Sequence, residues 1–105
     1  MKKQDSLRFE AQARVLKALA HPTRLFIAEE LGRGERCVCE LTQMIGADTS
    51  TVSKHLLIMK NAGIVAFEKR GTSLYYTLTM KCVLRFFSCV NEVLRKKASE
   101  QLQFV

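Results

Sequence analysis

Residues 37–78 constrain the fold of this chain more than any other segment, because they read in succession as two helices, a tight turn and a hairpin. Apolar spacing predicts a short helix from residue 39 or 40 to the glycine at position 46, and a second helix over residues 49–61. Either Asp48 or Thr49 can cap this second helix. Two helices joined by so short a turn have the geometry that places the second one in a DNA major groove.

The helix expected over residues 49–61 has two different faces. Val52, Leu56 and Met59 fall together on a helical wheel, so this side is expected to pack inward. The opposite side carries small hydrogen-bonding residues near its N-terminus, as a helix end that contacts base edges requires. Its lysine can reach a phosphate or a guanine edge. The candidate DNA contacts on this helix are Ser50, Thr51, Ser53, Lys54 and His55.

A hairpin is expected directly after this helix. Residues 64–70 and 73–78 are two β-rich runs about a glycine-containing turn. Lys69 and Arg70 would lie at the tip of the hairpin, where basic side chains grip the DNA backbone or minor groove. Together with Tyr75 in the second run they complete the candidate DNA contacts. A solvated turn without a DNA contact is the alternative interpretation of the same tip.

Three further helices are expected outside this segment, over residues 7–20, 22–31 and 79–101. Pro22 suits the first position of its helix, with His21 as a hydrogen-bonding residue at the start, and Gly32 and Gly34 are expected to end it. The predicted fold class is therefore mainly α with a small β-hairpin. It is a winged helix-turn-helix of five helices and a two-stranded wing, forming a single domain over residues 1–105.

The last helix carries more apolar surface than one face needs. Val83, Phe87, Val90 and Leu94 form one stripe, and a second stripe contains Phe86 and Val93 together with Cys82 and Cys89. Such a helix suggests an interface, so we expect residues 7–20 and 79–101 to form a homodimer contact. Burial as small apolar side chains is the default role for both cysteines, and a ligand role across the dimer is the alternative.

Composition narrows the class of protein and its partners. The 17 Lys and Arg against 10 Asp and Glu give a net charge of +7, which suits a polyanionic partner such as DNA. No apolar run reaches the ~20 residues that span a bilayer, and the N-terminus lacks a secretory h-region, so we expect a cytoplasmic protein without membrane contact. No nucleophile elbow, phosphate loop or paired-carboxylate motif is present, so we do not expect an enzyme.

Cys37 and Cys39 form a candidate site for a thiophilic ion. Residues two apart on a regular helix point in nearly opposite directions, so both sulfurs can share an ion only if Cys37 lies just outside the helix start. A helix N-terminus and the neighbouring Arg33 and Arg36 favour the thiolate, which is the ligand form. Soft thiolates select soft ions, and trivalent arsenic or antimony would suit a small sulfur cluster of this kind.

Four stretches together resemble the ArsR family of winged-helix, metal-responsive bacterial repressors. They are LKALAHPTRLFIAEEL (residues 16–31), CVCEL (37–41), TSTVSKHLLIMKNAGIV (49–65) and SLYYTL (73–78), and they follow the family's order. The resemblance implies a homodimer that binds an inverted-repeat DNA operator and releases it when a thiophilic ion binds. The arsenic-responsive branch is the one that we expect, with arsenite or antimonite as the inducer.

One position departs from that branch. Its members read CVCDLC, whereas this chain reads CVCELT, so Thr42 stands where a third cysteine is expected. Members that respond to cadmium or lead add a cysteine from an N-terminal extension, and residues 1–36 contain none. A third sulfur must come from Cys82, Cys89 or an exogenous thiol, or be missing. One alternative is a redox or reactive-sulfur sensor that binds no metal, in which Cys37 and Cys39, or Cys82 and Cys89, are oxidised or persulfidated. The other is a metal-storage protein that binds no specific DNA.

Overall fold

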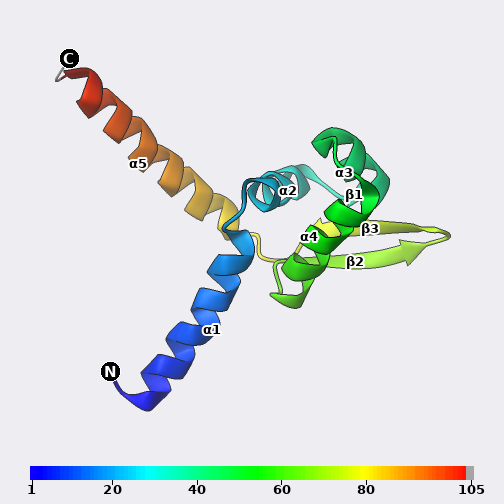
Figure 1. The fold of residues 1–105 in the computed structure, drawn as a ribbon, viewed down its shortest axis with the longest axis horizontal. Coiled ribbons are helices and arrows are strands. Elements are labelled where there is room, and N and C mark those ends of the chain that lie inside the picture. The colour runs from blue at the N-terminus through cyan, green and yellow to red at the C-terminus, as the bar shows by residue number, and fades with distance from the viewer. Residues whose placement is uncertain (104–105) are drawn as a thin grey trace.

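The computed structural model describes residues 1–103 and contains five helices and three strands within them. Helices α2, α3 and α4 pack with the sheet into a body, from which α1 and α5 extend as two arms (Figure 1). The β2–β3 hairpin projects from the other side of this body. In chain order the elements are α1 (Lys3–Leu19), α2 (Pro22–Arg33), β1 (Arg36–Cys37), α3 (Val38–Ile45), α4 (Thr49–Asn61), β2 (Val65–Arg70), β3 (Ser73–Leu78) and α5 (Val83–Gln103).

The predicted two-stranded wing is present as β2 and β3, and the sheet contains a third antiparallel strand that was not predicted, in the order β1-β3-β2. The additional strand β1 places Cys37 opposite Tyr75 and Arg36 opposite Tyr76. Two residues are too few to show the alternation by which a strand is recognised, and their partners lie far along the chain. The main hairpin has the predicted position, with Arg70 opposite Ser73 at its tip.

The core lies where α2, α3, α4 and the sheet meet. The side chains of Val52, Leu56 and Met59 on α4 are fully buried, which confirms the predicted inward face of this helix. Burial of apolar surface of this kind stabilises a folded protein by about 25 cal/mol per Å². The remaining core residues are Ala18, Leu19, Ile27, Ala28, Leu31, Leu41, Ile64, Val65, Tyr76, Leu78 and Val83.

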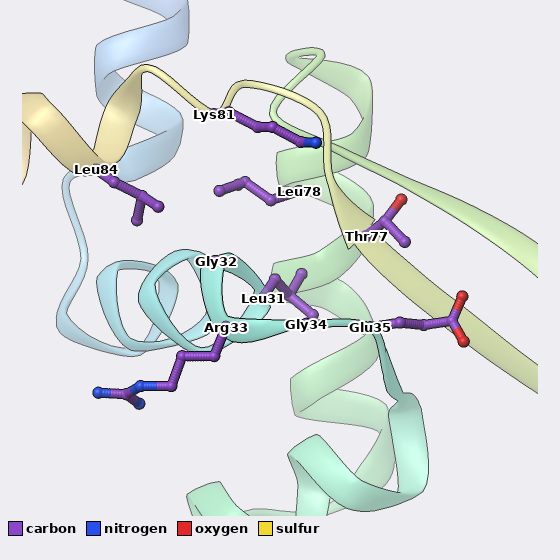
Figure 2. A pocket seen from close by; sticks show the side chains of 9 residues that line it. All are labelled: Leu31, Gly32, Arg33, Gly34, Glu35, Thr77, Leu78, Lys81 and Leu84. Carbon is purple, nitrogen blue, oxygen red and sulfur yellow. The ribbon is translucent and has the colours of Figure 1, made fainter.

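Helix α2 is longer than predicted. It continues through Gly32 to Arg33. At Gly32 the absence of a side chain lets α5 approach the helix closely. A Cβ atom on Gly32 would lie 2.7 Å from a methyl group of Leu84. Figure 2 shows this contact beside a cavity of about 330 Å³ between the end of α2, the end of β3 and the start of α5. Gly32 therefore serves as a close-packing position and not as a helix stop.

Helix α5 begins at Val83, four residues later than predicted. The backbone amides of Thr79 and Met80 both donate to the carbonyl of Ile64, at 2.9 and 3.1 Å, so this segment turns away from helical geometry. Cys82 consequently lies before the helix and does not share a regular helix face with Cys89. Both cysteines are exposed in the protomer, so their expected burial is not found in a single chain.

Helix α1 is also longer at its start than the predicted 7–20, since Asp5 in the first turn is favourable at a helix N-terminus. Both arms carry apolar side chains that the rest of the protomer does not cover. These are Leu7, Phe9 and Leu16 on α1 and Phe86, Val90, Val93 and Leu94 on α5, each at least 40% exposed. Among residues 1–103, no helix combines the length and apolar character needed to cross a membrane.

Candidate nucleic-acid interface and cysteine pair

The two central helices are joined by the short turn that the sequence predicts. Gly46 ends α3 with a φ of 77°, and its amide donates to the carbonyl of Thr42 at 2.9 Å. Only a residue without a Cβ adopts this left-handed conformation at little cost. Helix α4 then begins at Thr49, and its position against the core is determined by its buried face.

The N-terminus of α4 presents a polar, exposed surface. Ser50, Thr51, Ser53 and Lys54 are all exposed, as a helix end that reads base edges requires. The hydroxyls of Ser50 and Thr51 donate to the carboxylate of Asp48, and these hydrogen bonds lower the pKa of Asp48 to about 2. Asp48 is thus an ionised group within this surface. From the sequence it was predicted only as a possible helix cap.

His55 lies on the flank of this surface and is held by α2. The Nε of Arg24 donates to Nδ1 of His55 at 3.1 Å, and the rings of His21 and His55 lie 4.6 Å apart. Burial is the main cause of the lowered pKa of His55, and the nearby charges of His21 and Arg24 lower this pKa further. His55 is therefore neutral at pH 7 and accepts a hydrogen bond from α2. His21 Nδ1 accepts from the amide of Thr23 at the start of α2, as predicted.

The hairpin tip carries one exposed cation and one that is paired. Lys69 is exposed and lies opposite Leu74. The guanidinium of Arg70 makes two hydrogen bonds to Glu35, of 2.6 and 2.8 Å, and a third of 3.0 Å to Glu68. These bonds raise the pKa of Arg70, so its charge is permanent. The same guanidinium lies 4.8 Å above the ring centre of Tyr75. The contact with Glu35 was not predictable from the sequence.

Cys37 caps α3 and Cys39 lies in its first turn, as the argument for a Cys-x-Cys site required. The Sγ of Cys37 accepts from the amide of Glu40 at 3.3 Å, and the Glu40 carboxylate accepts from the amide of Cys37 at 3.0 Å. This is a capping box with cysteine in the place of serine. The structure joins the two sulfurs in a disulfide, whereas the sequence analysis favoured free thiol ligands. Cys37 is buried and Cys39 is exposed.

A chain of ion pairs links the end of α2 to the start of α3, where the cysteine pair lies. The buried carboxylate of Glu30 pairs with Arg33 at 2.7 Å and with Arg36 at 3.4 Å. Arg36 also reaches the carboxylate of Glu40 at 3.4 Å, so it bridges the end of α2 and the start of α3. Both of the predicted arginines are therefore engaged by carboxylates, and the buried glutamate was not predicted from the sequence.

No third ligand accompanies the pair within residues 1–103, where the structure brings no three His, Cys, Asp or Glu side chains together as a metal-binding group. The hydroxyl of Thr42 is buried and has no hydrogen-bond partner in the described part of the chain. Cys82 and Cys89 are free and exposed. The described structure therefore brings two sulfurs, and no third ligand, together at this site.

Helices α3 and α4 and the β2–β3 hairpin that follows them have the arrangement of a winged helix-turn-helix protein. A model of the bacterial regulatory protein arsR family matches residues 21–66. The chain is 36% identical over 87 residues to the HTH-type transcriptional regulator MJ1325 of Methanocaldococcus jannaschii, covering 82% of this chain and 98% of that protein. The chain therefore belongs to the ArsR family of transcriptional regulators.

Two further comparisons extend this result. A cadmium resistance transcriptional regulatory protein, the CadC homolog of Staphylococcus aureus, is 45% identical over 67 residues, covering 63% of this chain and only 55% of that protein. The homodimeric winged helix-turn-helix DNA-binding domain of Mb0332 from Mycobacterium bovis superposes with a TM-score of 0.80 at 31% identity, covering 95% of this chain and 93% of that domain. The relatives are transcriptional regulators and not enzymes, as the sequence predicts.

Proposed function

We propose that this chain is a homodimeric repressor that binds an operator through α4 and releases it when Cys37 and Cys39 react. The observation that carries this proposal is the position of the two cysteines. Their sulfurs lie together at the first turn of α3, and α3 is joined to α4 by a short turn. A chemical change at the pair acts on the helix that supports the recognition helix.

The operator contact is assigned to the polar end of α4 and to the wing. Two copies of α4, placed about one helical turn apart, would contact successive major grooves of an inverted repeat. The exposed residues Ser50, Thr51, Ser53 and Lys54 would approach the bases and phosphates, and His55 on the same helix, held by Arg24 of α2, would support them. Lys69, Arg70 and Tyr75 would contribute from the wing, and phosphate contacts of this kind make affinity fall steeply with salt.

The dimer contact is assigned to the arms α1 and α5. Their exposed apolar side chains form the uncovered surface described above, which a second copy of the chain would bury (Figure 1). Support comes from Mb0332, a homodimeric domain that matches this chain over most of its length. An isologous interface would place the two copies of α4 on one side of the dimer, related by a two-fold axis.

The first candidate signal is a thiophilic ion, with arsenite or antimonite preferred over cadmium or lead. The reduced pair supplies two soft thiolate ligands. Each thiol that binds arsenous acid replaces one hydroxide of arsenic, and its proton leaves with that hydroxide as water. A small-molecule thiol can displace the remaining hydroxide in the same way. This supplies the third sulfur that Thr42 does not, and Cys82 or Cys89 of either protomer is the alternative source.

The second candidate signal is oxidation, which the disulfide between Cys37 and Cys39 favours. Hydrogen peroxide takes up two electrons and two protons from the thiol pair and leaves as two water molecules. Cys39 is exposed and can meet the oxidant first, whereas Cys37 is buried and can resolve the product. Ion binding and oxidation use the same two sulfurs, so both predict that Cys37 is indispensable.

Fluorescence anisotropy on the DNA upstream of the protein's own gene tests the proposal. At physiological salt the reduced wild type should bind tightly and should release the DNA on addition of arsenite or, after the reductant is removed, of peroxide. Cys37→Ser should bind equally well and respond to neither reagent. The matched control replaces the two cysteines outside the pair, Cys82→Ser with Cys89→Ser, and should respond like the wild type if they are not ligands.

Each alternative has its own outcome. Release by peroxide alone selects the redox sensor, and release by arsenite under reducing conditions selects the ion sensor. Normal release by Cys37→Ser would refute the sensing site. Weak binding that is equal for all DNA sequences and vanishes at physiological salt would refute the repressor and favour a metal-storage protein.

A further inference from the structure

The wing cation Arg70 is already bound within the protein. Glu35 receives two parallel hydrogen bonds from its guanidinium, at 2.6 and 2.8 Å, and Glu68 receives one at 3.0 Å. A guanidinium presents its donors along fixed edges, so an edge that holds a carboxylate is not available to a phosphate. In this conformation three of the five N–H donors of Arg70 are taken up by carboxylates, so fewer remain for the DNA contact that its place at the hairpin tip suggests.

The carboxylate that holds Arg70 belongs to the segment of the cysteine pair. Glu35 directly precedes β1, and Cys37 is the second residue of that strand. Glu35 also lines the cavity beside the end of α2, and Figure 2 shows its carboxylate pointing away from Leu84 in the same lining. The strand pairs Cys37 with Tyr75, and the guanidinium of Arg70 lies on the ring of Tyr75. One two-residue strand therefore carries the sensor sulfur and positions two of the three groups that contact Arg70, namely Glu35 and Tyr75.

We propose that Glu35 is an autoinhibitory residue that competes with DNA phosphate for Arg70, and that the state of the cysteine pair controls this competition through β1. The second part rests on the proposed function. The structure holds the disulfide and the Glu35–Arg70 contact together, so the contact belongs to the state with low operator affinity. Two small-molecule thiols supply two electrons and two protons to the pair and leave as a disulfide, which frees Cys37 from Cys39. A displacement of Cys37 then moves Glu35, which lies two residues away on the same segment.

The magnitude of the effect follows from the exposure of the contact. The side chains of Arg70 and Glu35 are 46% and 35% exposed, so the ion pair is only partly protected from solvent. Release of one such pair is expected to change affinity about two- to threefold, and the two wings of a dimer give about fivefold together. Only a difference in the strength of the contact between the two thiol states couples it to the signal.

A double-mutant cycle on operator affinity tests the competition. Glu35→Gln keeps the size of the side chain and weakens its hold on Arg70, so it should tighten binding by about fivefold in the disulfide state. In an Arg70→Gln background the same change should have no effect. Glu29→Gln is the matched control, because it removes the same charge from an exposed position on α2 that makes no contact with Arg70 among the described residues. Thermal unfolding verifies that each variant is folded.

The outcomes separate the inference from the proposed function. An equal gain from Glu35→Gln with and without Arg70, or from Glu29→Gln, would show a general charge effect and overturn the competition. The ratio of oxidised to reduced dissociation constants should fall in Glu35→Gln, and an unchanged ratio would overturn the coupling through β1. A wild type whose affinity ignores the thiol state would refute the coupling, and one that ignores both the thiol state and arsenite would also refute the proposed function. In either case the cycle would still decide whether Glu35 competes for Arg70.

Discussion

Replacement of Leu56 by alanine tests how α4 is oriented, because the face that packs inward determines the face that reads DNA. Leu56 is fully buried in the core, whereas its neighbour Leu57 is 53% exposed. Truncation of a buried leucine costs about 2–5 kcal/mol, since the lost transfer free energy adds to that of the remaining cavity. For Leu56→Ala we expect about 3 kcal/mol. Leu57→Ala is the matched control and should cost less than about 1 kcal/mol.

Urea unfolding followed by circular dichroism measures both values at one fixed protein concentration, because the stability of a dimer depends on that concentration. With a slope of about 2 kcal/mol per molar urea, Leu56→Ala should lower the midpoint by about 1.5 M with the slope unchanged. The midpoint of Leu57→Ala should hardly move. Equal losses for the two variants, or a larger loss for Leu57→Ala, would refute the orientation of α4.

Three other predictions concern the start of α3, the support of α4 and the base of α5. Urea unfolding of the reduced variants should show that Cys37→Ala is about 1 kcal/mol less stable than Cys37→Ser, whose hydroxyl can accept from the Glu40 amide. Burial lowers the pKa of His55 below 6.5, so the unfolded state binds this proton first as pH falls, and the free energy of unfolding should decrease from about pH 7 to pH 5. His55→Gln should show a smaller decrease. Gly32→Ala favours the helix by about 1 kcal/mol through its propensity, but its methyl group crowds Leu84. Thermal unfolding should therefore show that Gly32→Ala stabilises the Leu84→Ala variant and does not stabilise the wild type.

The central part of the fold was predictable from the sequence because its signals are local. Helix α4 has the predicted bounds, Thr49–Asn61, since a glycine ends the preceding helix and another closes this one. Its inward face follows from three apolar residues at helical spacing. The hairpin was predictable for the same reason, because a glycine turn separates two β-rich runs. In these segments each residue's neighbours along the chain determine its conformation.

The remainder depends on contacts between distant residues. Strand β1 exists because it pairs with β3, and the late start of α5 follows from hydrogen bonds to Ile64. The Glu35–Arg70 contact joins residues 35 positions apart, so no periodicity reveals it. The candidate DNA contacts Ser50 and Lys54 were predicted from their helix face. Asp48 belongs to the same surface because its carboxylate accepts hydrogen bonds from the side chains of Ser50 and Thr51, and these bonds were not predictable from the sequence.

The geometry of the cysteine pair was predictable, but its chemical state was not. The short spacing of Cys37 and Cys39 requires one sulfur outside the helix, and Cys37 is indeed the capping residue of α3. The same short spacing serves either a shared ion or a disulfide, because both need the two sulfurs side by side. Thr42 in place of a third cysteine leaves two sulfurs at this helix start, and two thiols are the minimum for a disulfide.

The most direct test of the account is the operator affinity of one wild-type preparation in two states of Cys37 and Cys39, at the same physiological salt. Anisotropy titrations would be made on the reduced protein and on the same protein after the pair has been occupied by arsenite or joined as a disulfide, with mass spectrometry to verify the state. If Cys37 and Cys39 control operator binding, at least one of these reactions weakens binding by about 5- to 150-fold, the usual range of allosteric coupling. Equal affinity in all of these states would contradict it.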